Sequence, residues 1–508
     1  MATGFESTSD MGTRGNVAPW PRGLALALVL VAPGGRAEVR FEDRSVDLPV
    51  SHVYSGEWEH FVGGGVAVFD CDGDALPDIF AAGGTSPARL FRNRGDFRFE
   101  LGALPEMTAV TGAWPLDIDG DGHMDLAVLR VGENMLLRNQ GDCAFGRGDW
   151  GFAAGDAWST SFAATWEAGA GLPTLVVGNY VDRADPEGPF GACDASELHR
   201  PRNDGYGKPE RFETHCALSM LISDWARSGR RDLRVSNDRH YYIRGGREQM
   251  IRLDTMEELG GGDGWPEVSL WGMGIASRDL TGDRLPEVMS TSMGDQLLQI
   301  ATADGYVAAP YEIGTYAARP FLGDDGRPST GWHAEFGDVD NDGRDDLFIA
   351  KGNVDQMPSN ALKDPNNLLM QQSDGRFAET AEAAGVATVE RARGAALADF
   401  DLDGRLDLVV VNRRAPMELW RNVSDGTGHW LALNLEQPGP NRNAVGAWIE
   451  LEADGRTRWR EITVGGGHGG GQALPQHFGL GSEMGRGCGC IGRMAESRTG
   501  RTSEWIPG

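Results

Sequence analysis

Four acidic loops recur along the chain and constrain its fold more than any other feature. Each loop spans nine residues, with carboxylates at positions 1, 3, 5 and 9 and a glycine at position 4 or 6 that permits a tight turn. The loops read DCDGDALPD, DIDGDGHMD, DVDNDGRDD and DFDLDGRLD, and they begin at Asp70, Asp117, Asp338 and Asp399. Apolar, strand-like runs flank each loop, and a segment of the type LLRNQGD follows later. One unit repeated in this way predicts a repeat architecture.

Weaker copies of the loop begin at Glu167, Asp224 and Asp279, which gives seven units about 47 to 61 residues apart. Each unit has room for about four short strands and their turns. A sheet of that size cannot bury both of its faces alone, so the units must stack on one another. The sequence therefore predicts an all-β fold, a seven-bladed β-propeller. An open β-solenoid is the alternative, although its repeats are usually shorter.

The carboxylates of the four loops predict calcium sites, because Ca²⁺ takes six to eight hard oxygen ligands from alternating positions of a short loop. The predicted ligands are Asp70, Asp72, Asp74, Asp78, Asp117, Asp119, Asp121, Asp125, Asp338, Asp340, Asp342, Asp346, Asp399, Asp401, Asp403 and Asp407. The position-7 carbonyls of Leu76, His123, Arg344 and Arg405 are expected to complete the sites. An EF-hand is less consistent with these loops, since its Glu at position 12 is missing and the flanks have strand character.

A fifth, weaker calcium site is expected at Asp279, Thr281, Asp283 and Glu287, which keep an oxygen at all four positions. The loop at Asp224 has lost its position-3 oxygen, and the loop at Glu167 has lost nearly all of its ligands. These two are expected to be structural turns. The alternative for every loop is a set of Asx turns without metal.

Loops of the form DxDxDGxxD in units that carry Phe336-Gly337 resemble the FG-GAP or VCBS repeats of integrin-like β-propellers. The segment from His429 to Gly481 resembles the small β-rich ASPIC/UnbV module, with its NAVGA stretch at 443–447 and a terminal Phe-Gly-Leu-Gly. Together they resemble the bacterial members of the cartilage acidic protein family. The resemblance implies an exported Ca²⁺-binding propeller used for adhesion, matrix or ligand contact. UnbV-type proteins are also associated with enediyne biosynthetic loci.

The expected organisation is a signal peptide at 1–37, the propeller at 38–427, an ASPIC/UnbV-like module at 428–481 and an aberrant tail at 482–508. Arginines precede the apolar run Gly23–Ala32, which is too short to span a membrane and is followed by small residues before a cleavage site after Ala37. A buried N-terminal helix is the alternative. The tail departs from the family pattern after Gly481, which suggests a frameshift near Ser482 and the loss of the last module strand.

The composition excludes several other classes of function. With 47 Lys+Arg against 75 Asp+Glu the formal charge is -28, which disfavours nucleic-acid and anionic-membrane binding. HExxH and GxSxG motifs are missing, so the sequence does not support a zinc hydrolase or a serine hydrolase. Among the six cysteines, Cys193 and Cys216 are the predicted disulfide.

Two further segments carry structural expectations. The glycine-rich run VGGGHGGGQ (464–472) lacks the Gly-Lys-Ser/Thr of a phosphate loop, and His468 is expected in a flexible turn of the C-terminal module. The run at 44–53, which precedes the first blade, is expected to supply a strand that closes the ring against the last blade.

The sequence thus predicts a secreted, extracellular or periplasmic calcium-binding propeller without a transmembrane segment. It would act as an interaction or adhesion-type protein for a protein or glycan partner, through variable segments such as 182–214 on the rim opposite the calcium loops. The alternative is a propeller enzyme that acts on a polysaccharide or a secondary metabolite. A narrow acidic central pocket would favour the enzyme, and an exposed aromatic patch on one rim would favour binding. The identity of the ligand and the oligomeric state stay open.

Overall fold

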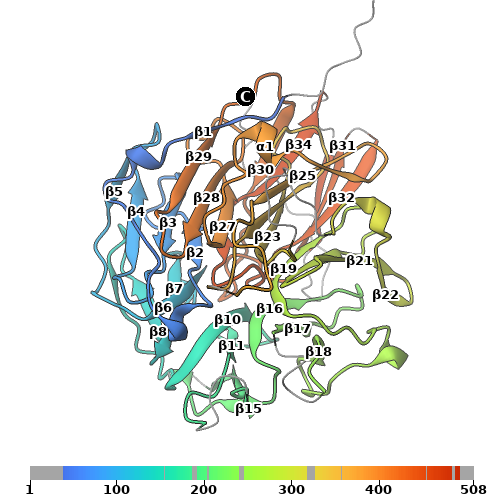
Figure 1. The fold of residues 1–508 in the computed structure, drawn as a ribbon. Coiled ribbons are helices and arrows are strands. Elements are labelled where there is room, and N and C mark those ends of the chain that lie inside the picture. Colours follow the sequence, from blue (N-terminus) through green and yellow to red (C-terminus); the bar gives the residue numbers. More distant parts are fainter. Residues whose placement is uncertain are drawn as a thin grey trace, which may run out of the picture. The chain divides into compact units, whose positions relative to one another are not determined.

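The computed structural model describes residues 38–153, 155–185, 191–202, 205–238, 245–316, 327–355, 357–453, 455–482 and 487–491. Within these residues the strands form seven antiparallel blades around a common axis and a smaller C-terminal set of strands (Figure 1). The chain passes around the ring in sequence order, from blue through green to orange (Figure 1). The predicted integrin-like β-propeller with a β-rich C-terminal module is confirmed.

The strands of each blade follow one another along the chain. Blade 1 contains β2 (Val66–Phe69), β3 (Asp78–Ala81), β4 (Arg89–Asn93) and β5 (Phe99–Leu101). Blade 2 contains β6 (Val110–Leu116), β7 (Asp125–Gly132), β8 (Met135–Asn139) and β9 (Phe145–Arg147). Blade 3 contains β10 (Ala157–Thr165), β11 (Thr174–Asn179), β12 (Ser196–His199) and β15 (Glu210–Phe212), with the hairpin β13 (Pro201–Arg202) and β14 (Gly205–Tyr206). In its described residues, blade 4 contains β16 (Ala217–Ser223), β17 (Asp232–Asn237) and β18 (Gln249–Arg252). Blade 5 contains β19 (Gly272–Arg278), β20 (Glu287–Ser292), β21 (Leu297–Thr302) and β22 (Gly305–Ala308). Blade 6 contains β23 (Gly331–Gly337), β24 (Asp346–Lys351), β25 (Asn367–Gln371) and β26 (Phe377–Glu379). Blade 7 contains β27 (Ala392–Ala398), β28 (Asp407–Asn412) and β29 (Glu418–Asn422) together with β1 (Phe41–Asp43).

The first strand of each blade is its inner strand, nearest the axis (Figure 1). Inner strands β6, β10, β16 and β27 are buried at every position. Their sequences are rich in small residues, as in ARGAALA of β27 and AWSTSFAAT of β10. Small side chains suit this place because the inner strands converge and leave little room between them. The larger apolar residues pack between neighbouring blades.

The N-terminal segment closes the ring. β1 pairs antiparallel with β29, and Phe41 lies opposite Asn422. The segment 44–53 does lie along the last blade, through the hydrogen bond from the Arg44 N–H to Leu419 O (2.7 Å) and the bridge from Val53 to Pro416, but the closing strand itself is 41–43 and so the predicted position was wrong. The short helices lie outside the blades: η1 (Ser45–Asp47), η2 (Trp58–His60), η3 (Gly261–Asp263), η4 (Tyr311–Ile313) and α1 (Ala381–Ala384).

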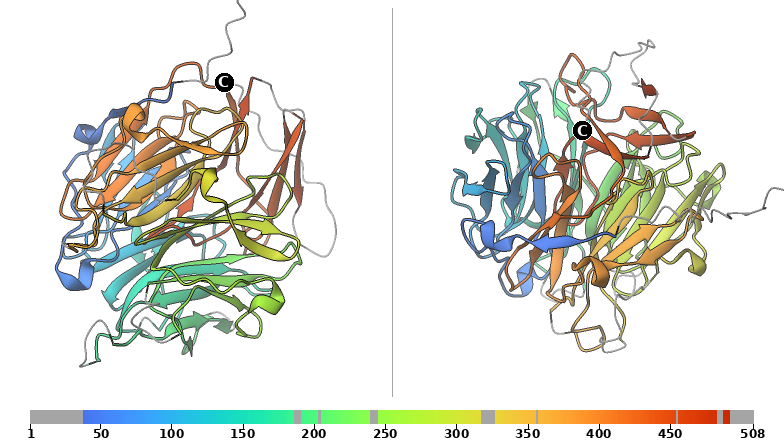
Figure 2. Two further views of the ribbon diagram at one scale, coloured as in Figure 1. Left: turned by 45° about the vertical axis from the view of Figure 1, so that its right-hand side comes forward. Right: turned by 90° about the horizontal axis from the view of Figure 1, so that it is seen from above.

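The C-terminal module lies on one side of the ring, where its strands are red in Figure 2. It contains β30 (His429–Leu433), β31 (Trp448–Ala453), β32 (Arg456–Glu461), β33 (Gln472–Ala473), β34 (Gln476–Gly481) and β35 (Gly487–Ile491). β35 pairs antiparallel with β31, so the tail supplies a strand to the module. The expectation that the last strand of the module is lost is therefore wrong. The remainder of the tail lies outside the described residues.

Two disulfides are present in the described part of the chain. One joins Cys193 to Cys216, as predicted, and the other joins Cys71 to Cys143. The expected signal peptide at 1–37 lies outside the described residues. The helices in the described part of the chain lack the length and the hydrophobicity of a membrane-spanning segment.

Candidate metal centres

The four acidic loops occupy the same place in their blades. Each loop leaves the end of an inner strand and finishes at the first residue of the second strand. The position-9 residues Asp78, Asp125, Asp346 and Asp407 thus begin β3, β7, β24 and β28. The loops therefore lie together on the rim where the inner strands end.

The position-9 carboxylate ties three parts of its blade together. In blade 1, the backbone N–H of Cys71 donates to Asp78 Oδ2 over 2.9 Å, and that of Asn93 donates to Asp78 Oδ1 over 2.8 Å. Equivalent pairs of hydrogen bonds reach Asp125 from Ile118 and Asn139, Asp346 from Val339 and Gln371, and Asp407 from Phe400 and Asn422. This frame holds the loop against the second and third strands through hydrogen bonds from backbone N–H groups.

In each loop, the carboxylates at positions 1, 3 and 9 converge. One oxygen from each residue lies within 4.8 Å of the others in four sets: Asp70, Asp72 and Asp78; Asp117, Asp119 and Asp125; Asp338, Asp340 and Asp346; and Asp399, Asp401 and Asp407. These buried acidic clusters could hold metal ions.

The carboxylates at position 5 do not join the clusters. Each accepts a hydrogen bond from the backbone N–H at position 7, as Asp74 does from Leu76 over 2.9 Å and Asp342 does from Arg344 over 3.0 Å. The same bond forms in the other two loops, from His123 to Asp121 and from Arg405 to Asp403. These are the Asx-type turns expected as the alternative to metal binding, so turn bonds and converging carboxylates coexist in one loop.

Unpaired carboxylate oxygens favour a cation in the clusters. Buried oxygens without a hydrogen-bond partner are Oδ1 of Asp72, Asp117 and Asp401. Asp117 is 1% exposed, so water does not solvate this oxygen. A buried polar atom left unpaired costs about 1 to 3 kcal/mol, and a bound cation would remove that cost. Because every donor is an oxygen, the residues fit a hard cation such as Ca²⁺ rather than a thiophilic metal.

Burial and mutual repulsion raise the pKa of several of the clustered carboxyls, whereas Arg92 holds the pKa of Asp72 below its usual value. Burial raises the pKa of Asp78 to about 7 and that of Asp125 to about 8, and neighbouring aspartates of the same loop add to both shifts. Burial likewise raises the pKa of Asp117 to about 6 and that of Asp399 to about 7. Arginines pair with the position-3 carboxylates Asp72, Asp119 and Asp401, so near neutral pH it is the carboxylates at positions 1 and 9 that favour either a proton or a cation.

The weaker copies differ in how much of this frame they keep. The blade-5 loop retains half of it, since the Leu280 N–H donates to Glu287 Oε2 over 2.7 Å while Glu287 Oε1 is buried and has no bond from the third strand. Its four predicted residues nevertheless form no cluster of three among the described residues. In blade 4 the Trp225 indole N–H donates to Asp232, and in blade 3 Arg200 pairs with Glu167 over 2.9 Å. Side-chain contacts thus replace the converging carboxylates in blades 3 and 4.

Three asparagines that sequence reasoning did not single out join three of the four acidic loops to the next blade. The side-chain amide of Asn139 donates to the carbonyl of Cys71 over 2.8 Å, from blade 2 to position 2 of the blade-1 loop. Asn93 makes the same bond to Phe400 over 2.7 Å, and Asn422 makes it to Val339 over 2.9 Å. All three follow an arginine in the recurring segments LFRN, LLRN and LWRN, so the repeat carried the signal.

The Cys71–Cys143 disulfide reinforces one of these joints. Cys71 is position 2 of the blade-1 loop, and Cys143 lies in the turn between β8 and β9 of blade 2. Their sulfurs lie near a carboxylate oxygen of Asp78, but disulfide sulfurs are not thiolate ligands. The disulfide therefore fixes a loop between two blades.

The propeller axis is occupied by residues 464–472, which we call the axial segment. Backbone bridges join Val464 to Ala164, Gly465 to Leu221, Gly467 to Ile275 and Gly470 to Ala113. These partners lie on the inner strands of blades 3, 4, 5 and 2, and β33 then pairs with β2 of blade 1. The expectation of a flexible turn was wrong, since His468 is fully buried and its ring lies 4.9 Å from that of Trp332.

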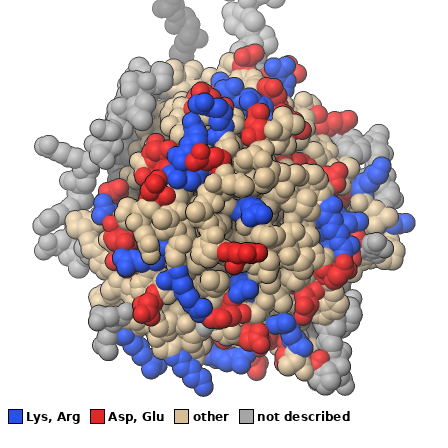
Figure 3. Space-filling model, turned by 90° about the vertical axis from the view of Figure 1, so that its left-hand side faces the viewer, with Lys and Arg blue, Asp and Glu red and all other residues tan. Residues whose placement is uncertain are grey.

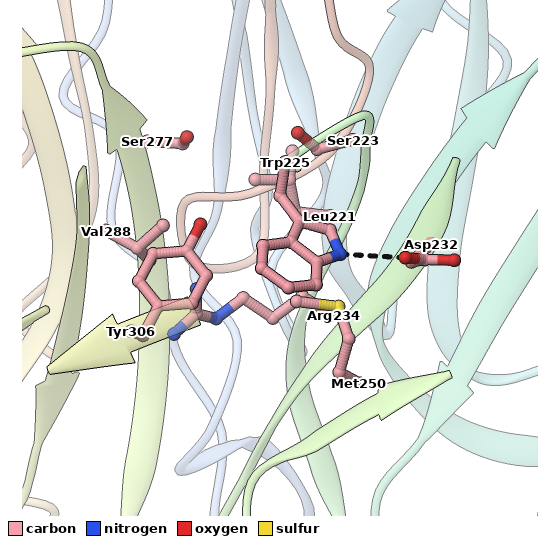
Figure 4. A pocket seen from close by; sticks show the side chains of 9 residues that line it. All are labelled: Leu221, Ser223, Trp225, Asp232, Arg234, Met250, Ser277, Val288 and Tyr306. Atoms are coloured by element: carbon pink, nitrogen blue, oxygen red, sulfur yellow. Dashed lines mark hydrogen bonds between the residues drawn. The ribbon is translucent and has the colours of Figure 1, made fainter. Parts of the chain in front are cut away.

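A small cavity between blades 4 and 5 lies apart from the clustered carboxylates. Figure 4 shows Trp225, Arg234 and Tyr306 among the residues that line it. The Trp225 and Tyr306 rings stack with centroids 5.4 Å apart, and the Arg234 guanidinium lies 5.0 Å from the Tyr306 ring. The cavity is part of the packing between blades.

The outer surface carries mixed charge. On the face in Figure 3, acidic and basic side chains are interspersed. This face therefore offers no single-sign field that would attract a polyanion. Elsewhere in the described residues, exposed charges form ion pairs such as Arg147 with Glu133 and Arg94 with Glu100.

Known structures and one known protein resemble parts of the chain. Solved structures with similar chains include BBS1N in complex with ARL6DN (TM-score 0.44, 10% identity, 76% of this chain and 97% of that one). A mutant of AofleA from Arthrobotrys oligospora has a TM-score of 0.37 at 13% identity, over 64% of this chain and 87% of that one. Cartilage acidic protein 1 of Mus musculus is 43% identical over 61 residues, which are 12% of this chain and only 9% of that protein.

Two family matches cover the loops and the module. Residues 70–128 and 338–410 match the FG-GAP-like repeat, and residues 437–486 match the family described as ASPIC and UnbV. All four acidic loops fall within the FG-GAP-like matches. The chain thus contains FG-GAP-like repeats and an ASPIC/UnbV domain, a combination that suggests a binding or adhesion-type protein.

Proposed function

We propose that this protein is a secreted calcium-binding propeller that binds a protein or glycan partner, like the bacterial members of the cartilage acidic protein family. The observation that carries the proposal is the repeated loop geometry, in which three carboxylates converge within 4.8 Å in each of four blades. Ca²⁺ would be held by the carboxylates at positions 1, 3 and 9 and by the position-7 carbonyl, and the position-5 carboxylate, which lies outside the clusters in this structure, would join them as a further oxygen donor. Its charge would offset the repulsion between carboxylates and stiffen the rim.

The disulfides support a location outside the cytoplasm. Disulfides persist in oxidising compartments, and thiol reductants remove them from most cytosolic proteins. Two of them occur in the described part of this chain. Together with the signal predicted at 1–37, they favour export to an extracellular or periplasmic location.

The rim opposite the acidic loops is the proposed contact surface. Trp158 lies near the start of β10, and the degraded acidic loop of blade 3 follows the end of that strand. Trp158 is therefore on the rim opposite the loops. Trp58 is 41% exposed and its ring lies 4.9 Å from that of Trp158, beside the ion pair of Glu59 with Arg183. An exposed indole supported by a buried aromatic suits stacking on a sugar ring or an apolar side chain.

The alternative, a propeller enzyme, has less support from the axis. Many of the backbone groups that a substrate could meet there already pair with the axial segment. An axial substrate would therefore have to displace residues 464–472 first. Binding at the rim requires no such displacement.

Two measurements test the proposal. Elemental analysis of the purified protein should find about four bound calcium ions, and thermal unfolding should shift to higher temperature with Ca²⁺. A glycan array should then give a binding signal, and Trp58→Ala should weaken it. Tyr311→Ala is the control, because Tyr311 is also an exposed aromatic residue (78%) but belongs to η4 and not to the proposed contact surface, so this variant should leave the signal unchanged. Finding neither ion nor shift would remove the main support, and turnover of an array glycan would favour the enzyme.

A further inference from the structure

The C-terminal module is seated on the acidic loops of blades 6 and 7. The contacts are hydrogen bonds to backbone carbonyls at positions 3, 4 and 6 of those loops. They run from the Gly428 N–H to Asp340 O (3.0 Å), from the Gly481 N–H to Asn341 O (2.8 Å) and from His477 Nε2 to Gly404 O (3.0 Å). Carbonyls are held in place only by the backbone conformation of the loop, so these bonds depend on loop geometry.

Close packing accompanies the hydrogen bonds. The Trp430 indole covers Gly404, where an added Cβ would lie 1.7 Å from Nε1. The chain of β34 passes the position-1 carboxylate of blade 6, since a Cβ on Gly479 would lie 2.0 Å from Asp338 Oδ2. The module therefore contacts loop atoms within one residue of the predicted ligands.

A buried ion pair adds a charged link. Arg460 of β32 donates through Nη2 to Asp345 Oδ1 over 2.8 Å, and both side chains are less than a tenth exposed. Asp345 is position 8 of the blade-6 loop and adjoins the predicted ligand Asp346. Breaking such a pair is costly because one charge stays buried without its partner.

The blade-1 loop provides an internal comparison. Its position-4 glycine, Gly73, would meet no atom within 4 Å if it carried a Cβ. The corresponding Gly120 of blade 2 would meet Pro440 of the module at 3.1 Å. The blade-1 loop therefore differs from the blade-2 and blade-6 loops at its tip, although β2, which leads into it, pairs with β33 at Val68 and Phe69.

The axial segment is continuous with the strands that contact the loops. It leaves the end of β32 and returns through β33 to β34, which carries His477 and Gly481. Its own amides bond to the blades: the Gly466 N–H to Met220 O (2.6 Å) and the Gly467 N–H to Ile275 O (2.7 Å). A displacement of β34 from the loops would therefore be transmitted to the axis.

We propose that metal in the loops of blades 6 and 7 holds the C-terminal module, and with it the axial segment, in place. Removal of Ca²⁺ leaves the clustered carboxylates to repel one another, the loop carbonyls shift, and the module and axial segment loosen from the propeller. The metal thereby controls access to the axis. This inference rests on the calcium sites proposed above and assigns a regulated role to the module.

Hydrogen exchange of the full chain tests the inference. Exchange at 464–472 is followed by mass spectrometry in Ca²⁺ and in chelator, with bound calcium counted by elemental analysis. We expect exchange of this peptide to become faster by about tenfold or more on chelation, because local opening frees its amides. Asp346→Asn should cause the same change in Ca²⁺ with the loss of one ion. The matched variant Asp78→Asn removes the equivalent ligand of blade 1 and should lose one ion with a smaller increase of exchange at 464–472, since Gly73 of that loop meets no atom of the module while β2 still pairs with β33.

Each outcome decides a separate point. If calcium binds but exchange at 464–472 is the same with and without it, the inference fails while the proposed calcium sites stand. Equal exposure of the segment in both variants would also overturn it, because the metal would then act only through overall stability. If no calcium binds, the proposed function itself fails.

Discussion

Gly470→Ala should destabilise the protein more than a single added methyl group ordinarily does. Gly470 lies where the axial segment crosses the inner strand of blade 1, and a Cβ there would lie 2.0 Å from Val66 O and 2.7 Å from Val66 C. Ordinary contact begins at about 3.4 Å, so the segment would have to move by about 1 Å. The hydrogen bonds on either side, between Ala113 and residues Gly469 and Gly471, are each already 3.2 Å long and would break.

The magnitude follows from these losses. Overpacking costs about 1 to 3 kcal/mol and each lost hydrogen bond about 1 kcal/mol. The reduced freedom of the unfolded chain returns about 0.4 to 1 kcal/mol, which leaves a net loss of about 2 to 5 kcal/mol. The control is Gly171→Ala, at an exposed glycine whose Cβ would meet no atom within 4 Å. That variant should be as stable as the parent or slightly more so.

Urea unfolding in Ca²⁺ measures the difference, followed by tryptophan fluorescence and by circular dichroism. Trp114 is a useful reporter because it packs against Gly471 of the axial segment. Coincident transitions from the two probes would justify a single free energy of unfolding. If Gly470→Ala unfolds within about 0.5 kcal/mol of Gly171→Ala, the axial segment does not pack as described and the reasoning is refuted.

Three further predictions concern the loops. The pKa of Asp125 is raised to about 8 in the folded state, so the metal-free protein binds more protons folded than unfolded between about pH 4 and pH 8. The melting temperature of the protein in chelator should therefore fall from pH 5.5 to pH 8, and Ca²⁺ should abolish this fall. A melting temperature that rises in chelator over the same range would contradict the reasoning. The double variant Cys71→Ser, Cys143→Ser should have a free energy of unfolding in urea about 2 to 4 kcal/mol lower than the parent. An unchanged free energy would show that the disulfide does not stabilise the contact between blades 1 and 2. Asn139→Ala leaves the Cys71 carbonyl unpaired and should cost about 1 to 3 kcal/mol, measured in the same way; an unaffected midpoint would count against the asparagine joints.

Much of the fold was predictable because its information is local. The ligand positions of one acidic loop lie within nine residues, so the spacing of Asp338, Asp340 and Asp346 alone indicated convergence. The repeat spacing gave the number of blades, since each blade is a run of consecutive strands. The Cys193–Cys216 disulfide was also predictable, because its partners are only 23 residues apart. Calcium itself stays a prediction.

Contacts between distant parts of the chain were decided only by the tertiary structure. The Cys71–Cys143 disulfide joins adjacent blades, and nothing in the local sequence of either cysteine identifies the other. Ring closure likewise begins at Phe41, because the register depends on how the last blade presents β29.

The axial segment shows the difference most clearly. Six glycines around His468 indicated a flexible turn when only neighbouring residues were considered. In the structure, a Cβ on Gly65 or on Gly112 would lie 1.6 Å from Gly469 O, so glycine is needed on both sides of a contact between segments about 400 residues apart. Composition alone does not distinguish a glycine that permits motion from one that permits close approach. The local sequence determined the blades and their acidic loops, whereas the packing of the ring decided what fills its axis and which loops support the C-terminal module.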